Sequence, residues 1–157
     1  MKHSIRWFCV LVAVLIATGA LSRGGASIAL AATDVLDQSQ TQFISSAGYD
    51  VAGGQVIAQT FTAEITGTLD RISVAVGEEG TPPSSMTVQI QTTSGGLPTG
   101  TVVGGGSMPA SAEPCCGKAI FVDIPLSTQP WVTQGIQYAI VLSCGACTDL
   151  FPSGHYY

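Results

Sequence analysis

Hydrophobic and polar residues alternate with a period of two along much of the chain after residue 32. The segment Leu69–Gly77 places Ile72, Val74 and Val76 on one side, and Met86–Gln91 alternates in the same way. This alternation is typical of β-strands that bury one face. Further strands are predicted at Gln55–Thr62, Lys118–Ile124 and Gln137–Ser143, with weaker ones near Val35–Ile44 and Thr101–Met108.

Turn-forming residues separate these runs. Glycine and proline cluster at Ala52–Gly54, Gly80–Pro83, Ser94–Gly100 and Gly104–Gly106. No stretch after residue 32 supports a helix longer than about two turns. Six or seven short strands, each with one buried face, predict an all-β protein built as an antiparallel, jelly-roll-like β-sandwich.

The N-terminus has the three-part pattern of a secretory signal. Basic Lys2 and Arg6 precede the apolar run Phe8–Leu21, and Ala29-Leu30-Ala31 follows. The apolar run is shorter than the roughly 20 residues that span a bilayer, so an uncleaved anchor is the lesser alternative. We expect a signal peptide at residues 1–31 and a β-sandwich domain at residues 32–157. Cleavage after Ala32 is nearly as favourable as cleavage after Ala31.

Removal of this peptide changes the charge. Two basic residues, Arg71 and Lys118, then remain against all ten acids, and the formal charge goes from −5 to −8. A domain this acidic is not expected to bind nucleic acid or an anionic membrane through a basic patch. We expect a secreted or cell-surface protein, with no membrane span in its mature form. N-linked glycosylation is excluded because the sequence contains no asparagine.

Four cysteines follow the signal segment: Cys115, Cys116, Cys144 and Cys147. An even number in an exported chain favours disulfides. Adjacent cysteines bridge poorly, and each pair flanks a predicted strand, so Cys115 and Cys116 are expected to cross-pair with Cys144 and Cys147. A four-cysteine zinc site and a redox C-x-x-C remain alternatives, although adjacent thiolates suit zinc badly and a redox pair usually begins a helix.

Aromatic residues are the candidates for ligand binding. Trp131 lies in the turn Gln129–Val132 and is the single tryptophan after the signal segment. It could stack on a sugar ring or fill the end of the core, and the second is the commoner role. Tyr156 and Tyr157 are further candidates. They end the sequence either as a frayed tail or as the beginning of a strand that continues beyond Tyr157.

Catalytic groups are not expected. A Ser-His-Asp triad needs a positioned histidine, and His155 is the single one after the signal segment. Glu78 and Glu79 could serve a hydrolase, but adjacent residues on an extended chain point apart, and a solvated loop is the expected environment. No cofactor is predicted. Calcium could be bound by a subset of four acids: Asp34, Asp37, Asp50 and Glu78.

The order of several short motifs resembles a family of bacterial extracellular β-sandwich modules that includes choice-of-anchor domains and looks like jelly-roll carbohydrate-binding modules. The motifs are Ala58–Thr62, Gly67–Leu69 with Ile72, Met86–Gln91, Ser94–Gly100, Val122–Leu126 and Val132–Ser143. Family members usually continue past the last of these with another aromatic-bearing strand, where ligand-binding residues often lie. No sugar site is therefore carried over.

These observations favour a non-catalytic extracellular module that binds a polysaccharide or another cell-surface component. The alternative is a structural domain, or a fragment of a larger surface protein, that has no ligand of its own. A hydrolase that uses Glu78 and Glu79 is the least favoured hypothesis.

Overall fold

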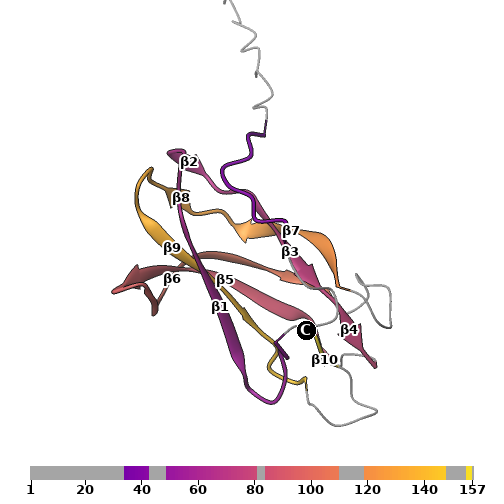
Figure 1. The fold of residues 1–157 in the computed structure, drawn as a ribbon. Coiled ribbons are helices and arrows are strands. Elements are labelled where there is room, and N and C mark those ends of the chain that lie inside the picture. Colours follow the sequence, from indigo (N-terminus) through magenta and orange to yellow (C-terminus); the bar gives the residue numbers. More distant parts are fainter. Residues whose placement is uncertain (1–33, 43–48, 81–83, 110–118, 148–154, 157) are drawn as a thin grey trace, which may run out of the picture. The chain divides into compact units, whose positions relative to one another are not determined.

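The computed structural model describes residues 34–42, 49–80, 84–109, 119–147 and 155–156 (Figure 1). The predicted signal peptide lies outside these residues. One compact unit spans Val35–Tyr157. Its described residues form strands and no helix: β1 (Val56–Thr62), β2 (Gly67–Thr68), β3 (Arg71–Val76), β4 (Glu78–Glu79), β5 (Met86–Ser94), β6 (Leu97–Met108), β7 (Ile120–Thr128), β8 (Trp131–Val132), β9 (Gln137–Ser143) and β10 (His155–Tyr156).

Six strands form one antiparallel sheet in the order β1-β9-β5-β6-β7-β3, and β2–β8 and β4–β10 form two short pairs. The β2–β8 pair continues the register of β1–β9 without a slip, across two interruptions of four residues each. The Ala63 amide donates to the Ile136 carbonyl within this break. The chain from β1 to β3 therefore runs as a ribbon against the chain from β7 to β9, which is the arrangement expected of a jelly-roll-like fold.

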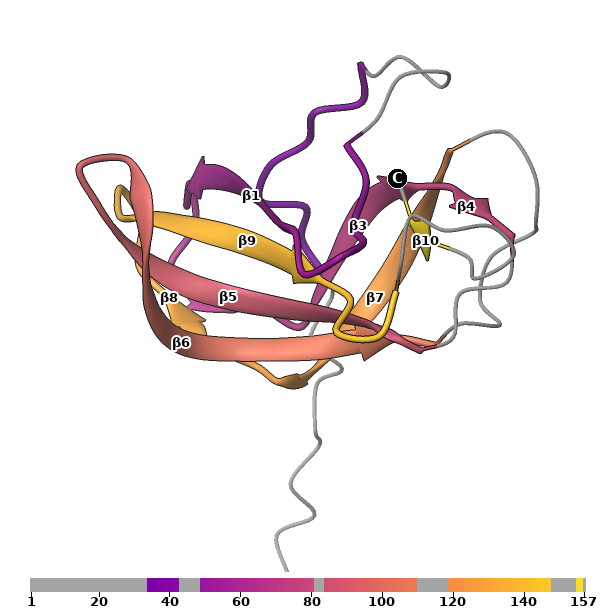
Figure 2. The same ribbon diagram turned by 90° about the horizontal axis from the view of Figure 1, so that it is seen from below.

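The sheet turns a corner between β6 and β7. In Figure 2, β5, β6 and β9 run across the view, whereas β3 and β7 run steeply up it. The pairing of β6 with β7 is confined to Gly105 and Gly106, opposite Thr128 and Leu126. A Cβ at Gly105 would lie 2.5 Å from the Val88 carbonyl oxygen, and a Cβ at Gly106 would lie 2.6 Å from that of Pro125. The corner needs glycine because backbones approach there too closely for any side chain.

The core lies between the two arms of this bent sheet. Met86, Val88 and Ile90 of β5 are each at most 1% exposed. They belong to one apolar cluster with Ile72 of β3 and Ile124 of β7. The intervening Thr87 is exposed and Gln89 is half-buried, so β5 shows the alternation that its sequence predicts. The prediction of an all-β antiparallel sandwich is confirmed.

Individual elements confirm or correct the sequence predictions. The predicted hairpin loop between Ser94 and Gly100 is shorter in the structure, where β6 begins at Leu97. Gly95 and Gly96 make its turn with φ of 59° and 79°, values that residues with a Cβ rarely adopt. The weak strand predicted near Val35–Ile44 is not formed over residues 35–42. Instead, the Asp37 carboxylate accepts hydrogen bonds from the amides of Glu64 and Ile65, at 2.9 and 2.6 Å.

Candidate functional site

The predicted cross-pairing of the cysteines is wrong for Cys144 and Cys147. These two residues form a disulfide with each other, with a Cα–Cα distance of 5.3 Å. Cross-pairing presumed that the two cysteine-flanked strands are neighbours, but β5 and β6 lie between β7 and β9. The chain turns directly after β9, and this brings Cys147 back to Cys144 within bridging distance. Cys115 and Cys116 lie outside the described residues.

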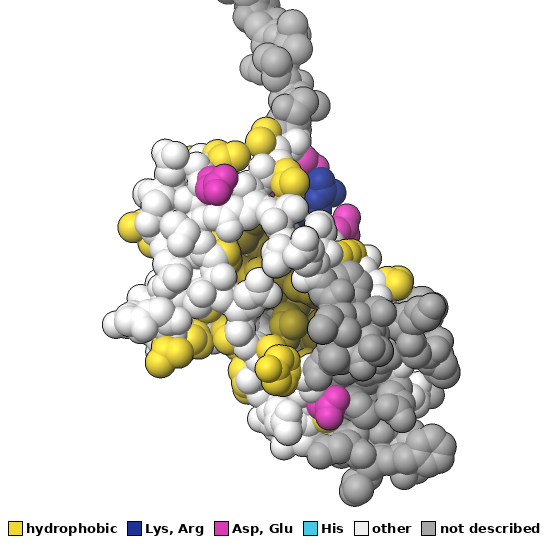
Figure 3. Space-filling model, viewed as in Figure 1, with side chains coloured by type: hydrophobic (Ala, Val, Ile, Leu, Met, Phe, Trp, Pro, Cys, Tyr) yellow, Lys and Arg dark blue, Asp and Glu magenta, His cyan; other side chains and the backbone are white. Residues whose placement is uncertain are grey.

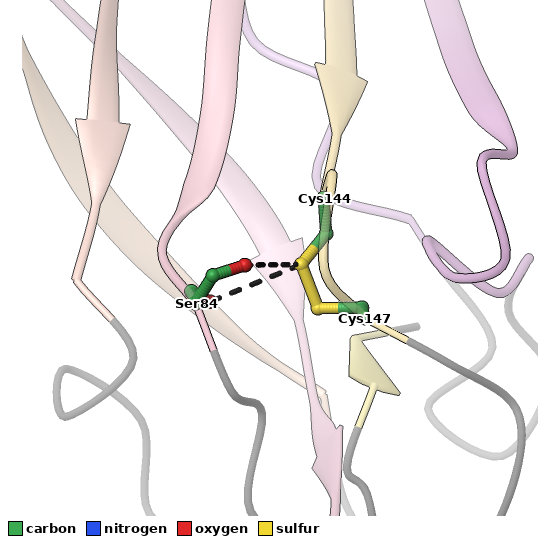
Figure 4. The surroundings of a disulfide bond; sticks show 3 residues. All are labelled: Ser84, Cys144 and Cys147. Carbon is green, nitrogen blue, oxygen red and sulfur yellow. Dashed lines mark hydrogen bonds between the residues drawn. A yellow bond between two sulfur atoms is a disulfide. The ribbon is translucent and has the colours of Figure 1, made fainter.

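The surroundings of this bridge are those of a structural element. Cys144 and Cys147 are 1% and 2% exposed and belong to the core cluster. The Ser84 hydroxyl lies 3.1 Å from the Cys144 Sγ (Figure 4). The Gly53 amide donates to the Cys147 carbonyl at 2.9 Å, so the bridged turn also anchors the segment that leads into β1. Because both sulfurs are used in the bridge, this C-x-x-C pair offers no thiolate for zinc in this state.

Trp131 does not fill the core. Its side chain is 66% exposed, while its neighbours Pro130 and Val132 are buried. β8 pairs Trp131 with Thr68 of β2, and the Leu69 amide donates to the Pro130 carbonyl at 2.9 Å. The backbone around Trp131 is thus held by the segment Thr68–Leu69. An exposed indole on a fixed backbone provides an apolar ring face that a ligand can cover.

An open groove crosses the outer side of β6. Its volume is about 340 Å³. Gln89 lines it from β5, and Ser127 and Thr128 line it from β7. The β6 residues Val102, Val103, Gly104, Gly105, Gly106 and Ser107 complete the lining. None of the lining residues is ionisable, so the groove offers an amide, hydroxyls, backbone groups and two valines.

Pro130, the residue before Trp131, packs against the backbone of β6. A Cβ at Gly104 would lie 2.4 Å from the Pro130 Cδ, so the proline ring packs directly on the backbone of the groove. Trp131 follows Pro130 in the chain, but neither residue lines the groove. The sequence pattern had already marked Gln89 as an outward position of its strand. The contributions of β6 and β7 became visible only once the sheet was folded around the corner.

The other aromatic candidates lie elsewhere. β10 pairs with β4, with Tyr156 opposite Glu78 and His155 opposite Glu79. β4 follows the C-terminal end of β3 in the chain. β2, the strand that pairs with Trp131, precedes the N-terminal end of β3. The structure therefore does not bring Tyr156 to Trp131. Tyr157 and the side chains of β10 lie outside what the structure describes.

The acidic residues that the structure describes do not gather into a metal site. Among the described residues, no group of three or more His, Cys, Asp or Glu side chains is placed to hold a metal ion. The Asp37 carboxylate is already engaged by two backbone amides. Charged side chains are sparse and scattered over the described part of the face in Figure 3. The described residues therefore provide no defined calcium site.

Glu78 was expected in a solvated loop, but its side chain is 6% exposed. Its Oε2 is buried and has no hydrogen-bond partner among the described residues. Burial disfavours the carboxylate and raises the pKa of Glu78 above 4.5. Glu78 does not line the groove.

Replacement of Glu78 by glutamine should increase stability in a pH-dependent way. The folded protein holds a proton on Glu78 at pH values where the unfolded chain has lost it, so wild-type stability falls as pH rises from about 4.5 through the raised pKa. The amide variant has no such fall. We expect the free energy of unfolding of E78Q to exceed that of the wild type by about 1 kcal/mol at pH 7 and to differ little from it at pH 4. Urea titrations at both pH values test this, with exposed Glu64→Gln as the control. An equal difference at both values would contradict it.

Comparisons with known proteins identify no relative: no protein-family model, curated protein or solved structure matches the chain. Among the described residues, no helix has the length and apolar character needed to cross a membrane.

Proposed function

We propose that this chain is an exported, non-catalytic binding module and that its ligand is a glycan of an extracellular or cell-surface polymer. The observation that carries the proposal is the uncharged groove across β6, together with the exposed indole of Trp131 on β8, the strand that follows β7 in the chain. Sugars present hydroxyls to polar groups and apolar ring faces to aromatic side chains. The groove residues supply the first kind of partner and the indole supplies the second.

The charge of the chain is compatible with this ligand class. Of its lysines and arginines, only Arg71 lies in the described part of the structure, and the sequence has ten acids. Acidic proteins repel polyanions, so nucleic acids and strongly anionic surfaces are poor partners. Uncharged glycans do not experience this repulsion.

Replacement of Trp131 by alanine should weaken glycan binding about tenfold without unfolding the domain. The side chain is mostly exposed, so its loss removes ring stacking and little core packing. Binding is first sought on a glycan array and on insoluble polysaccharides, and the affinity for any hit is then measured by calorimetry. Leu97→Ala is the matched control, because Leu97 is 70% exposed and lies at the β5–β6 hairpin rather than on β8.

Two outcomes oppose the proposal. If the folded protein binds no glycan on the array or in the pull-down, a structural domain without a ligand becomes the better explanation. If Trp131→Ala and Leu97→Ala bind a hit as tightly as the wild type does, a glycan is bound, but at another site.

A further inference from the structure

A chain of amide hydrogen bonds runs to the groove from the β5–β6 hairpin. The backbone amide of Gly100 donates to the Gln91 Oε1 at 2.9 Å. The Gln91 Nε2 in turn donates to the Gln89 Oε1 at 2.7 Å. Gln91 is only 7% exposed, so this link is shielded from water and held in one geometry.

The direction of these bonds is fixed by chemistry. A backbone N–H can only donate, so the Gln91 atom that meets Gly100 must be its carbonyl oxygen. The Gln91 nitrogen then faces Gln89, and Gln89 must accept with its own oxygen. The Gln89 Nε2 takes no part in this chain of bonds and has no hydrogen-bond partner among the described residues. Because Gln89 lines the groove, the groove receives an N–H donor of fixed direction.

A donor held in one direction discriminates between ligand groups, whereas freely rotating hydroxyls in the groove do not. The hydroxyls of Ser107 and Thr128 can rotate to donate or to accept, and a sugar hydroxyl adapts in the same way. The Ser127 hydroxyl donates to the Gly105 carbonyl at 3.2 Å and is left to accept. A carbonyl oxygen can only accept, so it gains most from a donor held in place. Val102 lines the same groove, is 49% exposed and is the cross-strand partner of Gln91. It offers an apolar contact beside the donor.

We propose that the groove binds uncharged glycans that carry N-acetyl groups in preference to glycans that carry hydroxyls alone. The acetamido carbonyl accepts from the Gln89 Nε2, and its methyl group contacts Val102. Gln91 acts as a positioning residue, because it sets the direction of the Gln89 amide without lining the groove itself. This assignment rests on the proposed glycan-binding function and specifies its ligand.

Two oligosaccharides that differ in this group test the proposal. Chitohexaose and cellohexaose share the same linked sugar ring, and the first has an N-acetyl group where the second has a hydroxyl. Calorimetry should show chitohexaose binding at least tenfold more tightly, as expected for one well-placed hydrogen bond and a methyl contact.

Two near-isosteric variants separate donor direction from shape. Gln89→Glu still accepts from Gln91 but has no N–H for the groove, so the ratio of chitohexaose affinity to cellohexaose affinity should fall about tenfold. Gln91→Glu should accept from both Gly100 and the Gln89 Nε2, turning the Gln89 amide around. Gln91→Glu should therefore cause the same loss of preference for chitohexaose although Gln89 itself is unchanged. A general loosening of the strand would instead weaken the binding of both oligosaccharides. The melting temperature of each variant confirms that it is folded.

The results distinguish this inference from the function on which it rests. Equal affinity for the two oligosaccharides, or an unchanged preference in folded Gln89→Glu, overturns the N-acetyl preference and leaves glycan binding in place. Binding of neither oligosaccharide also overturns the preference. In that case a positive glycan array still supports the broader function, and a silent array removes both.

Discussion

Replacing Ile90 by alanine should lower the free energy of unfolding by about 3–4 kcal/mol. Ile90 is 0% exposed and lies in the centre of β5, the strand that pairs with both β6 and β9. The change removes three buried carbon atoms and leaves a cavity that a strand fixed on both sides cannot close. This loss is a large part of the stability of a domain of this size.

Urea unfolding with the disulfide intact measures the effect, and an unchanged m-value would show that the denatured state is unaltered. Thr87→Ala on the exposed side of the same strand is the control, with an expected change of less than about 0.5 kcal/mol. A similar small change for Ile90→Ala would mean that β5 does not turn this face to the core.

Replacing Gly106 by alanine should cost about 2–3 kcal/mol, the second large effect. A Cβ at this position would lie 2.6 Å from the Pro125 carbonyl oxygen and 3.3 Å from the Leu126 Cα. Both contacts are backbone atoms of β7, so β7 itself would have to move, and its pairing with β6 is limited to this region. Overpacking against backbone cannot be relieved by a side-chain rotation.

Gly67→Ala is the control for Gly106→Ala. Gly67 also lies in a strand, and a Cβ there would meet no atom within 4 Å. Its replacement should be neutral or slightly stabilising, because alanine reduces the conformational entropy of the unfolded chain. Equal thermal stability of the two variants would show that the sheet does not turn its corner at Gly106. The groove would then lose its structural basis as well.

The candidate site was partly foreseeable. Trp131 stood out as the single tryptophan after the signal segment, whereas the alternation of Met86–Gln91 placed Gln89 on the polar side of a strand without marking it as a site residue. The packing of Pro130 against Gly104, which places the residue before Trp131 against β6, joins positions 26 residues apart in the sequence. No local pattern reports such a contact. The exposure of Trp131 was also not foreseeable, because tryptophan is equally suited to a core and to a binding surface.

The sequence by itself determined the longer strands, most of the turns between them and the buried face of strands such as β3 and β5. These properties depend on a period of two and on glycines with positive φ, both of which act between residues close in the chain. Only the tertiary structure decided the strand order, the Cys144–Cys147 bridge and the burial of Glu78. Placing β5 and β6 between β9 and β7 requires every pairing to be satisfied together, so proximity along the chain did not predict proximity in the sheet. The same placement assembled the groove from three strands.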